Sequence, residues 1–392
     1  MSDPVVMLVA AEPSGDALGA GLAASLRAKL GGRVRFVGIG GPLMAAQGVA
    51  SPFDIAPLSV LGVFDALRVW PLVRRRAREA GELAVREAPQ VAVMIDSWGF
   101  NLRVAHAIRR ARREVFLIKY VAPQVWATRP GRARTLAGAV DELLTIHSFD
   151  AAWFERAGLR TQFVGNPVLA RVGGGADRAA FRAAIGAGPG DPVLLLAPGS
   201  RRGEIERLLR PFEAAAAELA ANRPTLKVVV LAAEAVADEL AARAAKWSIP
   251  VHLARSGKDH AAAMAGATAA LACSGTVTTE LALAGAPMVV AYRLGPFTYP
   301  IVRLLIRTPY ITLFNVAAGR AVAPELLQGD CTGSRLAAAI APLLDDPDLQ
   351  ARQAKAQRSA VEKMRGGIAD PSGAAADAVI ARLRVQRDSS GV

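Results

Sequence analysis

Short apolar runs alternate with helix-length amphipathic segments along the first half of the chain. Each run is of strand length and carries few polar positions, which is typical of strands buried on both faces of a parallel sheet. Helices are expected between the runs, and this βα rhythm predicts a doubly wound parallel sheet. The expected strands are Pro4–Ala11, Val34–Gly38, Val91–Ile95, Val115–Val121, Val140–Ile146 and Gln162–Val164. A turn is expected at Glu12–Asp16, directly after the first strand.

A second series of the same kind follows residues 171–191, a segment rich in Gly, Ala and Pro that we interpret as an interdomain link. Two Rossmann-like, doubly wound domains of the α/β class are therefore predicted, facing each other across a cleft and covering residues 1–168 and 169–345. Helices at about 346–385 either complete the first domain or contact a second copy in a homodimer. The strands of the second series are expected at Val193–Ala197, Lys227–Ala232, Val251–Leu253, Ala269–Ala272 and Met288–Tyr292.

Composition argues against disulfide-rich, zinc-binding and membrane-spanning classes of protein. The chain has 392 residues, of which 52% are hydrophobic, so large cores are expected. Its two cysteines have no CxxC spacing and its four histidines are scattered, so neither a disulfide framework nor a protein-built zinc site is expected. No apolar run of about 18 residues occurs, so we expect no membrane-spanning helix. We predict a cytoplasmic, soluble or peripheral protein without a metal or cofactor.

Positive charge is concentrated in one block. The net charge is +13, and the segment Arg68–Arg134 holds fifteen Lys and Arg against five acids. Such a block suits nucleic acid, anionic lipid or an anionic substrate, or is simply a solvated basic face. Aromatic residues do not alternate with the basic ones, and no nucleic-acid-binding motif is recognised, so we do not expect nucleic acid as a partner. Residues 60–78 mix apolar and Arg positions, which suits a helix on an anionic membrane surface as well as one packed on a core.

The third apolar run ends abruptly at Asp96. Ser97–Gly99 are expected to form a loop, with a helix from about Asn101. Ligands of open α/β sheets bind beyond the carboxyl ends of the strands, so a carboxylate there is a candidate general base. The alternative is an ordinary helix cap or turn residue.

Two loops of the second half are candidate anion sites. Gly199, Ser200 and Arg201 join a strand to a helix, where free N–H groups and the helix dipole attract phosphate. A second loop of small residues, 274–276, repeats the arrangement, and Glu280 follows it. Together they predict a nucleotide diphosphate site, although any single loop of this kind is weak evidence. The GxGxxG pattern fails at Leu43, and no P-loop occurs.

A set of motifs spread over almost the whole chain resembles the lipid-A-disaccharide synthase family. They are Glu12–Asp16, Phe36–Pro42, Asp96 with Phe100–Asn101, Ala122–Ala127, Phe163–Pro167, Leu196–Arg201 with Glu204–Ile205, Ser274–Thr276 with Glu280, Pro287–Arg293, Pro309–Tyr310 with Asn315, and Pro324–Gln328.

The resemblance implies an inverting hexosyltransferase of GT-B architecture in lipid A biosynthesis, at the inner face of the inner membrane. It implies that UDP-2,3-diacylglucosamine condenses with 2,3-diacylglucosamine 1-phosphate to give a β-1,6 disaccharide and UDP. The alternative is another GT-B enzyme acting on a UDP-sugar, such as a different glycosyltransferase or an epimerase.

The resemblance also assigns site residues. Asp96 stands at the position of the essential base. The chain departs from the usual family pattern at Ala11, at Ser97–Gly99 and at Asn166, which bears on the acceptor contacts. The residues expected around UDP are Gly199, Ser200, Arg201, Ser274, Gly275, Thr276, Glu280, Asn315 and Gln328, and those expected near the acceptor are Glu12, Ser14, Gly15, Asp16, Asn101 and Trp126.

Overall fold

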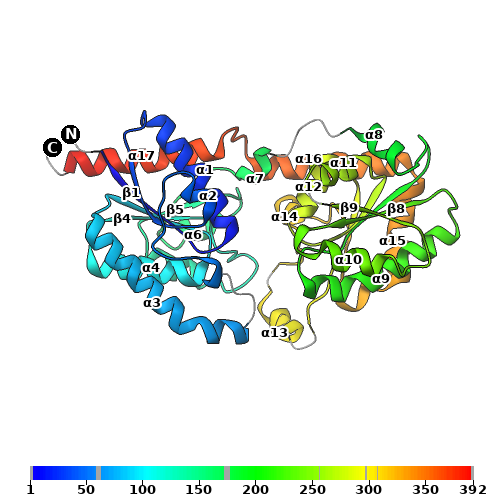
Figure 1. Cartoon of the computed structure of the whole chain (residues 1–392), viewed down its shortest axis with the longest axis horizontal. Helices are drawn as coiled ribbons and strands as arrows, with labels where there is room; N and C mark the ends of the chain where they lie inside the picture. The colour runs from blue at the N-terminus through cyan, green and yellow to red at the C-terminus, as the bar shows by residue number, and fades with distance from the viewer. Residues whose placement is uncertain are drawn as a thin grey trace. The chain divides into compact units, whose positions relative to one another are not determined.

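The computed structural model describes residues 3–58, 63–171, 177–255, 257–295, 298–306 and 308–389. The chain divides into two compact units: unit 1 consists of Met1–Ala170 and Arg365–Val392, and unit 2 of Arg171–Met364. Each unit holds one six-stranded parallel sheet with helices on both faces (Figure 1). The predicted α/β class with two doubly wound sheets is confirmed.

The sheet of unit 1 runs in the order β2-β1-β3-β4-β5-β6. The chain moves outward from β1 to β2 and then returns to place β3 on the other side of β1. This reversal is a topological switch point, where helices on opposite faces leave a crevice at the carboxyl ends of the strands. The strands are β1 (Val5–Ala10), β2 (Arg35–Ile39), β3 (Val91–Ile95), β4 (Phe116–Tyr120), β5 (Glu142–Thr145) and β6 (Arg160–Phe163).

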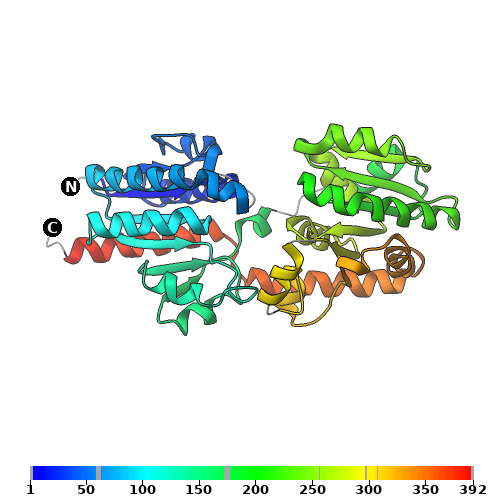
Figure 2. The same cartoon turned by 90° about the horizontal axis from the view of Figure 1, so that it is seen from below.

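Alternate residues of the central strands face different helix layers. Met7 and Val9 pack in one core beside α3 (Val63–Glu87) and α4 (Trp98–Ala111). Leu8 packs in the other core beside α1 (Pro13–Lys29) and α17 (Pro371–Ser389), and Figure 1 shows these two pairs on opposite sides of the sheet. Figure 2 shows α3 and α4 side by side across the sheet of unit 1. The short helices are α2 (Pro42–Ala45), η1 (Ala56–Leu58), α5 (Arg132–Ala137), α6 (Ala151–Glu155) and α7 (Pro167–Arg171).

The sheet of unit 2 runs in the order β12-β11-β10-β7-β8-β9, with its switch point between β7 and β10. Helices α9 and α15 pack on one face of this sheet. The strands are β7 (Val193–Ala197), β8 (Lys227–Ala232), β9 (Val251–Arg255), β10 (Ala269–Cys273), β11 (Met288–Tyr292) and β12 (Glu325–Leu327). The helices are α8 (Arg178–Ala184), α9 (Arg202–Ala221), η2 (Glu234–Val236), α10 (Ala237–Ala244), α11 (Lys258–Gly266), α12 (Thr276–Ala284), α13 (Thr298–Leu305), α14 (Leu313–Ala318), η3 (Gln328–Asp330), α15 (Gly333–Asp345) and α16 (Pro347–Arg365).

Two loops of the sequence analysis are helical in the structure. The segment Glu12–Asp16 was expected to be a turn, but α1 begins at Pro13, because proline is well suited to the first position of a helix. The segment Ser97–Gly99 was expected to be a loop, but α4 begins at Trp98. Strand β12 and helices α13 and α14 were not predicted, because short elements carry too few residues to show a period.

The C-terminal helices are divided between the units. Helix α16 belongs to unit 2 as far as Met364, whereas α17 belongs to unit 1. Ala376 and Val379 of α17 complete the core beside β1. Arg382 of α17 donates from Nε to Glu142 Oε2 of β5 at 2.7 Å, and this carboxylate is buried. The predicted domain boundaries, with the extension at 346–385, stay a prediction.

Among the described residues, no helix is both long enough and apolar enough to cross a membrane.

Candidate functional site

The carboxyl end of β3 brings Asp96 to the switch point of unit 1. Strands β1 and β3 pair in register, with Ala10 opposite Ile95, so the segments that follow them are neighbours. Ser14 Oγ, in the first turn of α1, donates a hydrogen bond to Asp96 Oδ2 at 2.7 Å. Gly15 makes this approach possible, because a Cβ there would lie 3.2 Å from the Ile95 carbonyl oxygen. Asp96 and Ser14 therefore meet where an α/β sheet binds its ligand.

The backbone at Asp96 is strained and held in place. Asp96 has φ +54° and Ser97 has φ +24°, values that residues with a side chain rarely adopt. Asn101, which is fully buried, donates from Nδ2 to the carbonyl oxygens of Ile95 and Asp96 at 2.7 and 3.0 Å. The Asp96 amide donates to the Tyr120 carbonyl at 2.9 Å. Strain of this kind persists only where the surroundings fix it, and it is common at active sites.

Lys119 of β4 lies beneath the same peptide and was not singled out from the sequence. Its side chain is buried, and its ammonium donates to the carbonyl oxygens of Asp96, Tyr120 and Met94. Burial lowers the pKa of Lys119 to about 8, against the opposing effect of the charges on Asp96 and Glu12. A lysine inside an otherwise apolar strand was the signal in the sequence.

A cavity of about 310 Å³ opens at this edge of the sheet. Asp96, Trp98 and Lys119 line it on the β3 and β4 side, and Gln124, Thr128 and Arg132 line it from the segment that follows β4. The guanidinium carbon of Arg132 lies 5.0 Å from the centre of the Trp98 ring. The cavity thus combines a carboxylate, two cations, a hydroxyl and an amide group, a set that suits a polar ligand.

Asp16 has a structural role in this unit. Its carboxylate is buried and accepts hydrogen bonds from the amides of Gly41, Leu43 and Met44 at 2.8 to 3.0 Å. It therefore anchors the start of α2 to α1. Glu12, at the N-terminal boundary of α1, is half-buried.

Trp126, which was expected near the acceptor, is also less accessible to a ligand than we expected. It is 8% exposed, and its Nε1 donates to Asp150 Oδ1 at 3.0 Å. Burial raises the pKa of Asp150 to about 7 and lowers the pKa of His147 to about 4. His147 stacks on Phe149, whose ring also meets Trp126 edge to face. Trp126 thus belongs to a buried cluster beyond β4 and β5, and it supports the segment that lines the cavity.

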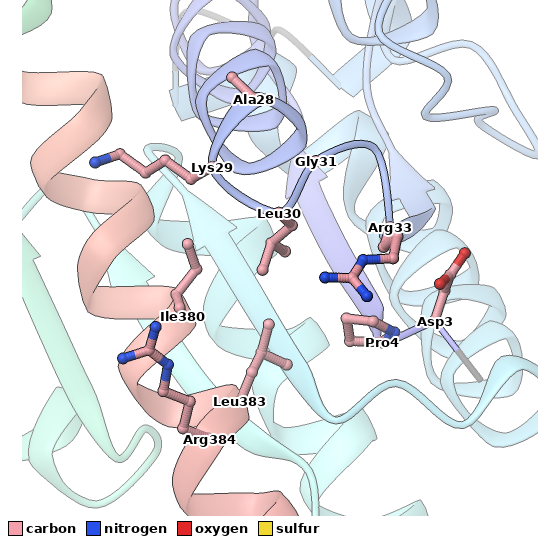
Figure 3. Close-up of a pocket in the computed structure, with 10 residues that line it drawn as sticks. All are labelled: Asp3, Pro4, Ala28, Lys29, Leu30, Gly31, Arg33, Ile380, Leu383 and Arg384. Carbon is pink, nitrogen blue, oxygen red and sulfur yellow. The ribbon is translucent and has the colours of Figure 1, made fainter. Parts of the chain in front are cut away.

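A larger cavity of unit 1, of about 580 Å³, lies elsewhere (Figure 3). It is lined by Pro4 before β1, by Leu30 and Arg33 after α1, and by Leu383 and Arg384 of α17. These residues place it at the amino ends of the strands, away from Asp96. Because ligand sites of parallel sheets form at the carboxyl ends, the cavity beside Asp96 is the candidate active site.

In unit 2, the first anion loop is already occupied by a side chain of the protein. Glu204, in the first turn of α9, accepts from the amides of Ser200 and Arg201 at 3.1 and 3.4 Å. Arg201 donates from its guanidinium to Glu204 Oε1 at 3.3 Å. Gly199 has φ +119°, and a Cβ there would lie 2.7 Å from Glu204 Cβ. The amides that we expected to be free for a phosphate therefore hold a carboxylate.

The second anion loop is open. It lies beside the first, because β10 pairs with β7 in register and Ala272 faces Ala197. Gly275 and Thr276 are exposed, and nothing lies within 4 Å of where a Cβ of Gly275 would stand. Thr278 closes the first turn of α12 by donating to the Gly275 carbonyl at 2.7 Å. Ser274 donates more weakly, to the Ile311 carbonyl at 3.4 Å, and burial raises the pKa of the half-buried Glu280.

Asn315 was expected beside UDP, but its amide group is used by the protein. It is fully buried, its Nδ2 donates to the Ala323 carbonyl and to Glu325 Oε1, and its Oδ1 accepts from the amides of Val322 and Ala323. Glu325, which lies in the motif Pro324–Gln328 but was assigned no role, also accepts from the amides of Ile311 and Thr312. Asn315 and Glu325 thus fix the backbone that Ser274 touches.

Gln328 follows β12 at the carboxyl edge of the sheet, with φ +53°. Like Asp96, it is a residue with a side chain in a conformation that favours glycine.

No cluster of three or more residues able to hold a metal occurs in the described part of the chain.

Solved structures with the same fold include two that hold a UDP-sugar. The UDP-N-acetylglucosamine 2-epimerase of Neisseria meningitidis, bound to UDP-GlcNAc, is 12% identical with a TM-score of 0.58, over 97% of this chain and 98% of that one. Anabaena HepE in complex with UDP-glucose is 15% identical with a TM-score of 0.55, over 96% and 99%. At these identities the likeness shows the fold alone.

Similarity in sequence is much closer. A model of the lipid-A-disaccharide synthetase family matches residues 6–379. The lipid-A-disaccharide synthase of Paramagnetospirillum magneticum is 42% identical over 97% of this chain and 98% of that protein. The enzyme of Rhodospirillum centenum is 40% identical over 97% and 95%. The chain therefore belongs to the lipid-A-disaccharide synthase family of glycosyltransferases.

Proposed function

We propose that this glycosyltransferase joins UDP-2,3-diacylglucosamine to 2,3-diacylglucosamine 1-phosphate, with Asp96 as the base. The observation that carries the proposal is the held, strained Asp96 beside a polar cavity at the switch point of unit 1. Family membership supplies the reaction. The backbone bonds from Asn101 and Lys119 leave the Asp96 carboxylate with Ser14 as its partner among the described residues, so it can accept a proton from a substrate hydroxyl.

The chemistry follows from inversion. The acceptor 6-hydroxyl gives its proton to Asp96 while its oxygen bonds to the anomeric carbon of the donor. The bond from that carbon to the diphosphate breaks on the opposite side, and UDP leaves with the electron pair. An α-linked donor then gives a β-1,6 product. A positioned base contributes about 100- to 10,000-fold to such a step.

Unit 2 supplies the groups suited to the leaving diphosphate. Arg201 carries a guanidinium fork, and the open start of α12 presents the backbone of Gly275 and Thr276. Helix N-termini and arginine stabilise the negative charge that develops on a leaving phosphate. Asn315 acts here as a positioning residue, through the loop that Ser274 touches.

The test measures UDP release from UDP-2,3-diacylglucosamine with and without the monosaccharide acceptor. The proposed function predicts release that depends on acceptor, whereas an epimerase or hydrolase would act on the donor alone. Asp96→Asn keeps the shape and the bond to Ser14 but removes the base. We expect its turnover to fall by about 1,000-fold with UDP affinity unchanged. Turnover near that of the unmodified enzyme would remove Asp96 from this role.

We also propose that the enzyme works at the inner face of the inner membrane, through part of the predicted segment 60–78. Residues 60–62 and the side chains of 63–69 lie outside the described part. In the remainder, Trp70 is 46% exposed and Arg74, Arg75 and Arg78 are exposed on α3. Glu79 pairs with Arg75 at 3.7 Å and with the half-buried Arg76 at 2.7 Å, and Arg76 also stacks on Phe53.

Vesicle binding tests this surface. Glu substitutions at Arg74, Arg75 and Arg78 should abolish binding to vesicles with anionic lipid at low salt, because each basic residue near such a surface contributes about 1 kcal/mol. The matched control makes the same change at three exposed positions of α16, Arg352, Lys355 and Arg358. Equal loss in both variants would show a general charge effect and contradict the proposed surface. The homodimer stays a prediction, which sedimentation velocity would test.

A further inference from the structure

We propose that Arg132 binds the 1-phosphate of the acceptor and makes the enzyme specific for a phosphorylated acceptor. The inference rests on the proposed function, because it takes its ligand from that reaction. It deepens that function by assigning the part of the acceptor sugar that carries the phosphate.

Arg132 is the cation of the cavity that remains available. The other one, Lys119, is engaged with three backbone carbonyl oxygens. Within the described ranges, the guanidinium of Arg132 makes no hydrogen bond or ion pair, and its recorded interaction is with the Trp98 ring. A half-buried arginine without a counter-ion is a strong site for phosphate, because its planar fork can donate two parallel hydrogen bonds.

Trp98 fixes where this guanidinium lies. It begins α4, directly beyond the strained pair Asp96–Ser97, and packs against the core of unit 1. Arg132 begins α5, after the segment that follows β4. Its guanidinium carbon stands 5.0 Å from the Trp98 ring centre, a distance typical of a cation–π contact. The departure of this chain from the family pattern at Ser97–Gly99 thus places an aromatic platform under the arginine.

Size and connectivity agree with a sugar phosphate. The cavity of about 310 Å³ is at the lower end of ligand pockets, so it suits a hexosamine phosphate but leaves the acyl chains outside. In the acceptor, C1 and C5 flank the ring oxygen, and C5 carries the reacting C6. The phosphate and the 6-hydroxyl are therefore carried on the two sides of the ring oxygen, and Asp96 and Arg132 likewise line the wall of one cavity. Thr128 and Gln124 add hydrogen-bonding groups there.

The test compares two acceptors, 2,3-diacylglucosamine 1-phosphate and its methyl glycoside, which lacks the phosphate. Arg132→Gln should lower kcat/KM for the phosphorylated acceptor by about 10- to 100-fold, chiefly through KM, as expected for a lost charged hydrogen bond. It should leave kcat/KM for the methyl glycoside unchanged, so that the two acceptors converge. Arg132→Lys keeps the charge but not the fork, and should fall in between.

The matched control is Arg134→Gln, which removes the same charge from the exposed side of α5. It should leave both acceptors unaffected. An equal loss for both acceptors in Arg132→Gln would overturn the proposal, and so would a loss of UDP affinity, because the arginine would then serve the donor.

Failure of the proposed function is recognised separately. In that case the unmodified enzyme shows no acceptor-dependent release of UDP. The contribution of Arg132 can still be measured without donor, as the equilibrium affinity of the Asp96→Asn variant for each of the two acceptors. Tighter binding of the phosphorylated acceptor that Arg132→Gln abolishes supports the site, and equal binding of both acceptors rejects it.

Discussion

The carboxyl edges of the two sheets, where the strands end, are organised in different ways. At the edge of unit 1, Asp96 is fixed by side-chain bonds to its own peptide from Asn101 and Lys119. At the edge of unit 2, the expected anion site is filled by Glu204 in an exposed contact with Arg201. In the proposed function, the first edge is ready for chemistry as it stands, and the second must exchange the Glu204 carboxylate for a diphosphate.

This difference matches what the proposed function requires of each edge. A proton transfer needs a base held within hydrogen-bond reach of the acceptor hydroxyl, and small displacements slow it strongly. A leaving group has to enter and depart in every cycle, so tight permanent order there would slow release. Substitutions in unit 1 should therefore lower turnover, and those in unit 2 should change affinity.

After Asp96→Asn, the largest expected effect is at Lys119. Lys119→Met removes the hydrogen bonds that hold the Asp96 peptide, so we expect turnover to fall by about 100-fold with UDP affinity unchanged. Because burial lowers the pKa of Lys119 to about 8, the folded enzyme loses this proton as pH rises through 8. The turnover of the unmodified enzyme should decline over that range, and the decline should be missing in Lys119→Met. A weakened UDP affinity in Lys119→Met would contradict the expectation that substitutions in unit 1 change turnover and not affinity.

A smaller effect is expected at Arg201. Arg201→Ala should weaken UDP binding by about 10- to 100-fold in titration calorimetry, since it removes a charged donor. Its neighbour Arg202, whose side chain is 80% exposed and near Glu239, provides the control, and Arg202→Ala should bind UDP normally. If both variants bind UDP equally well, the diphosphate does not lie at the start of α9.

The smallest effect is expected at Glu204. Glu204→Gln keeps the size of the side chain but removes the negative charge that competes with a diphosphate, so UDP should bind up to about 10-fold more tightly. The direction of the change in UDP affinity tests whether the edge of unit 2 differs from that of unit 1. Weaker binding would mean that Glu204 is a partner of the nucleotide and that this edge is preformed as well.

Most of the fold could be predicted from the sequence, because buried parallel strands are apolar runs with clear ends. The position of Asp96 beyond β3 followed from such an end. The starts of α1 and α4 were missed, since Pro13 and Trp98 were assigned to turns. The short strand β12 carries three residues and has no visible period.

The site was harder to predict because a polar residue near a strand end can serve either a ligand or the backbone. Asp16 and Asn315 have the residue types of ligand contacts, yet the structure gives their hydrogen bonds to main-chain groups. Lys119 and Arg132 were passed over within a generally basic block. Their different positions appear only in the structure, where Lys119 donates to the Asp96 carbonyl and Arg132 lines the cavity.

Helix α17 has a consequence for how the protein is made. It covers the face of the unit 1 sheet with residues such as Ala376 and Val379, and Arg382 neutralises the buried Glu142. On the ribosome these residues appear only after all of unit 2 has been synthesised, although domains generally fold in the order of synthesis. The sheet that precedes Asp96 must therefore wait with part of one apolar face uncovered. Its buried Glu142 then has Arg160 of β6, at 3.2 Å, but not yet Arg382. Unit 2, although later in the sequence, can finish folding first.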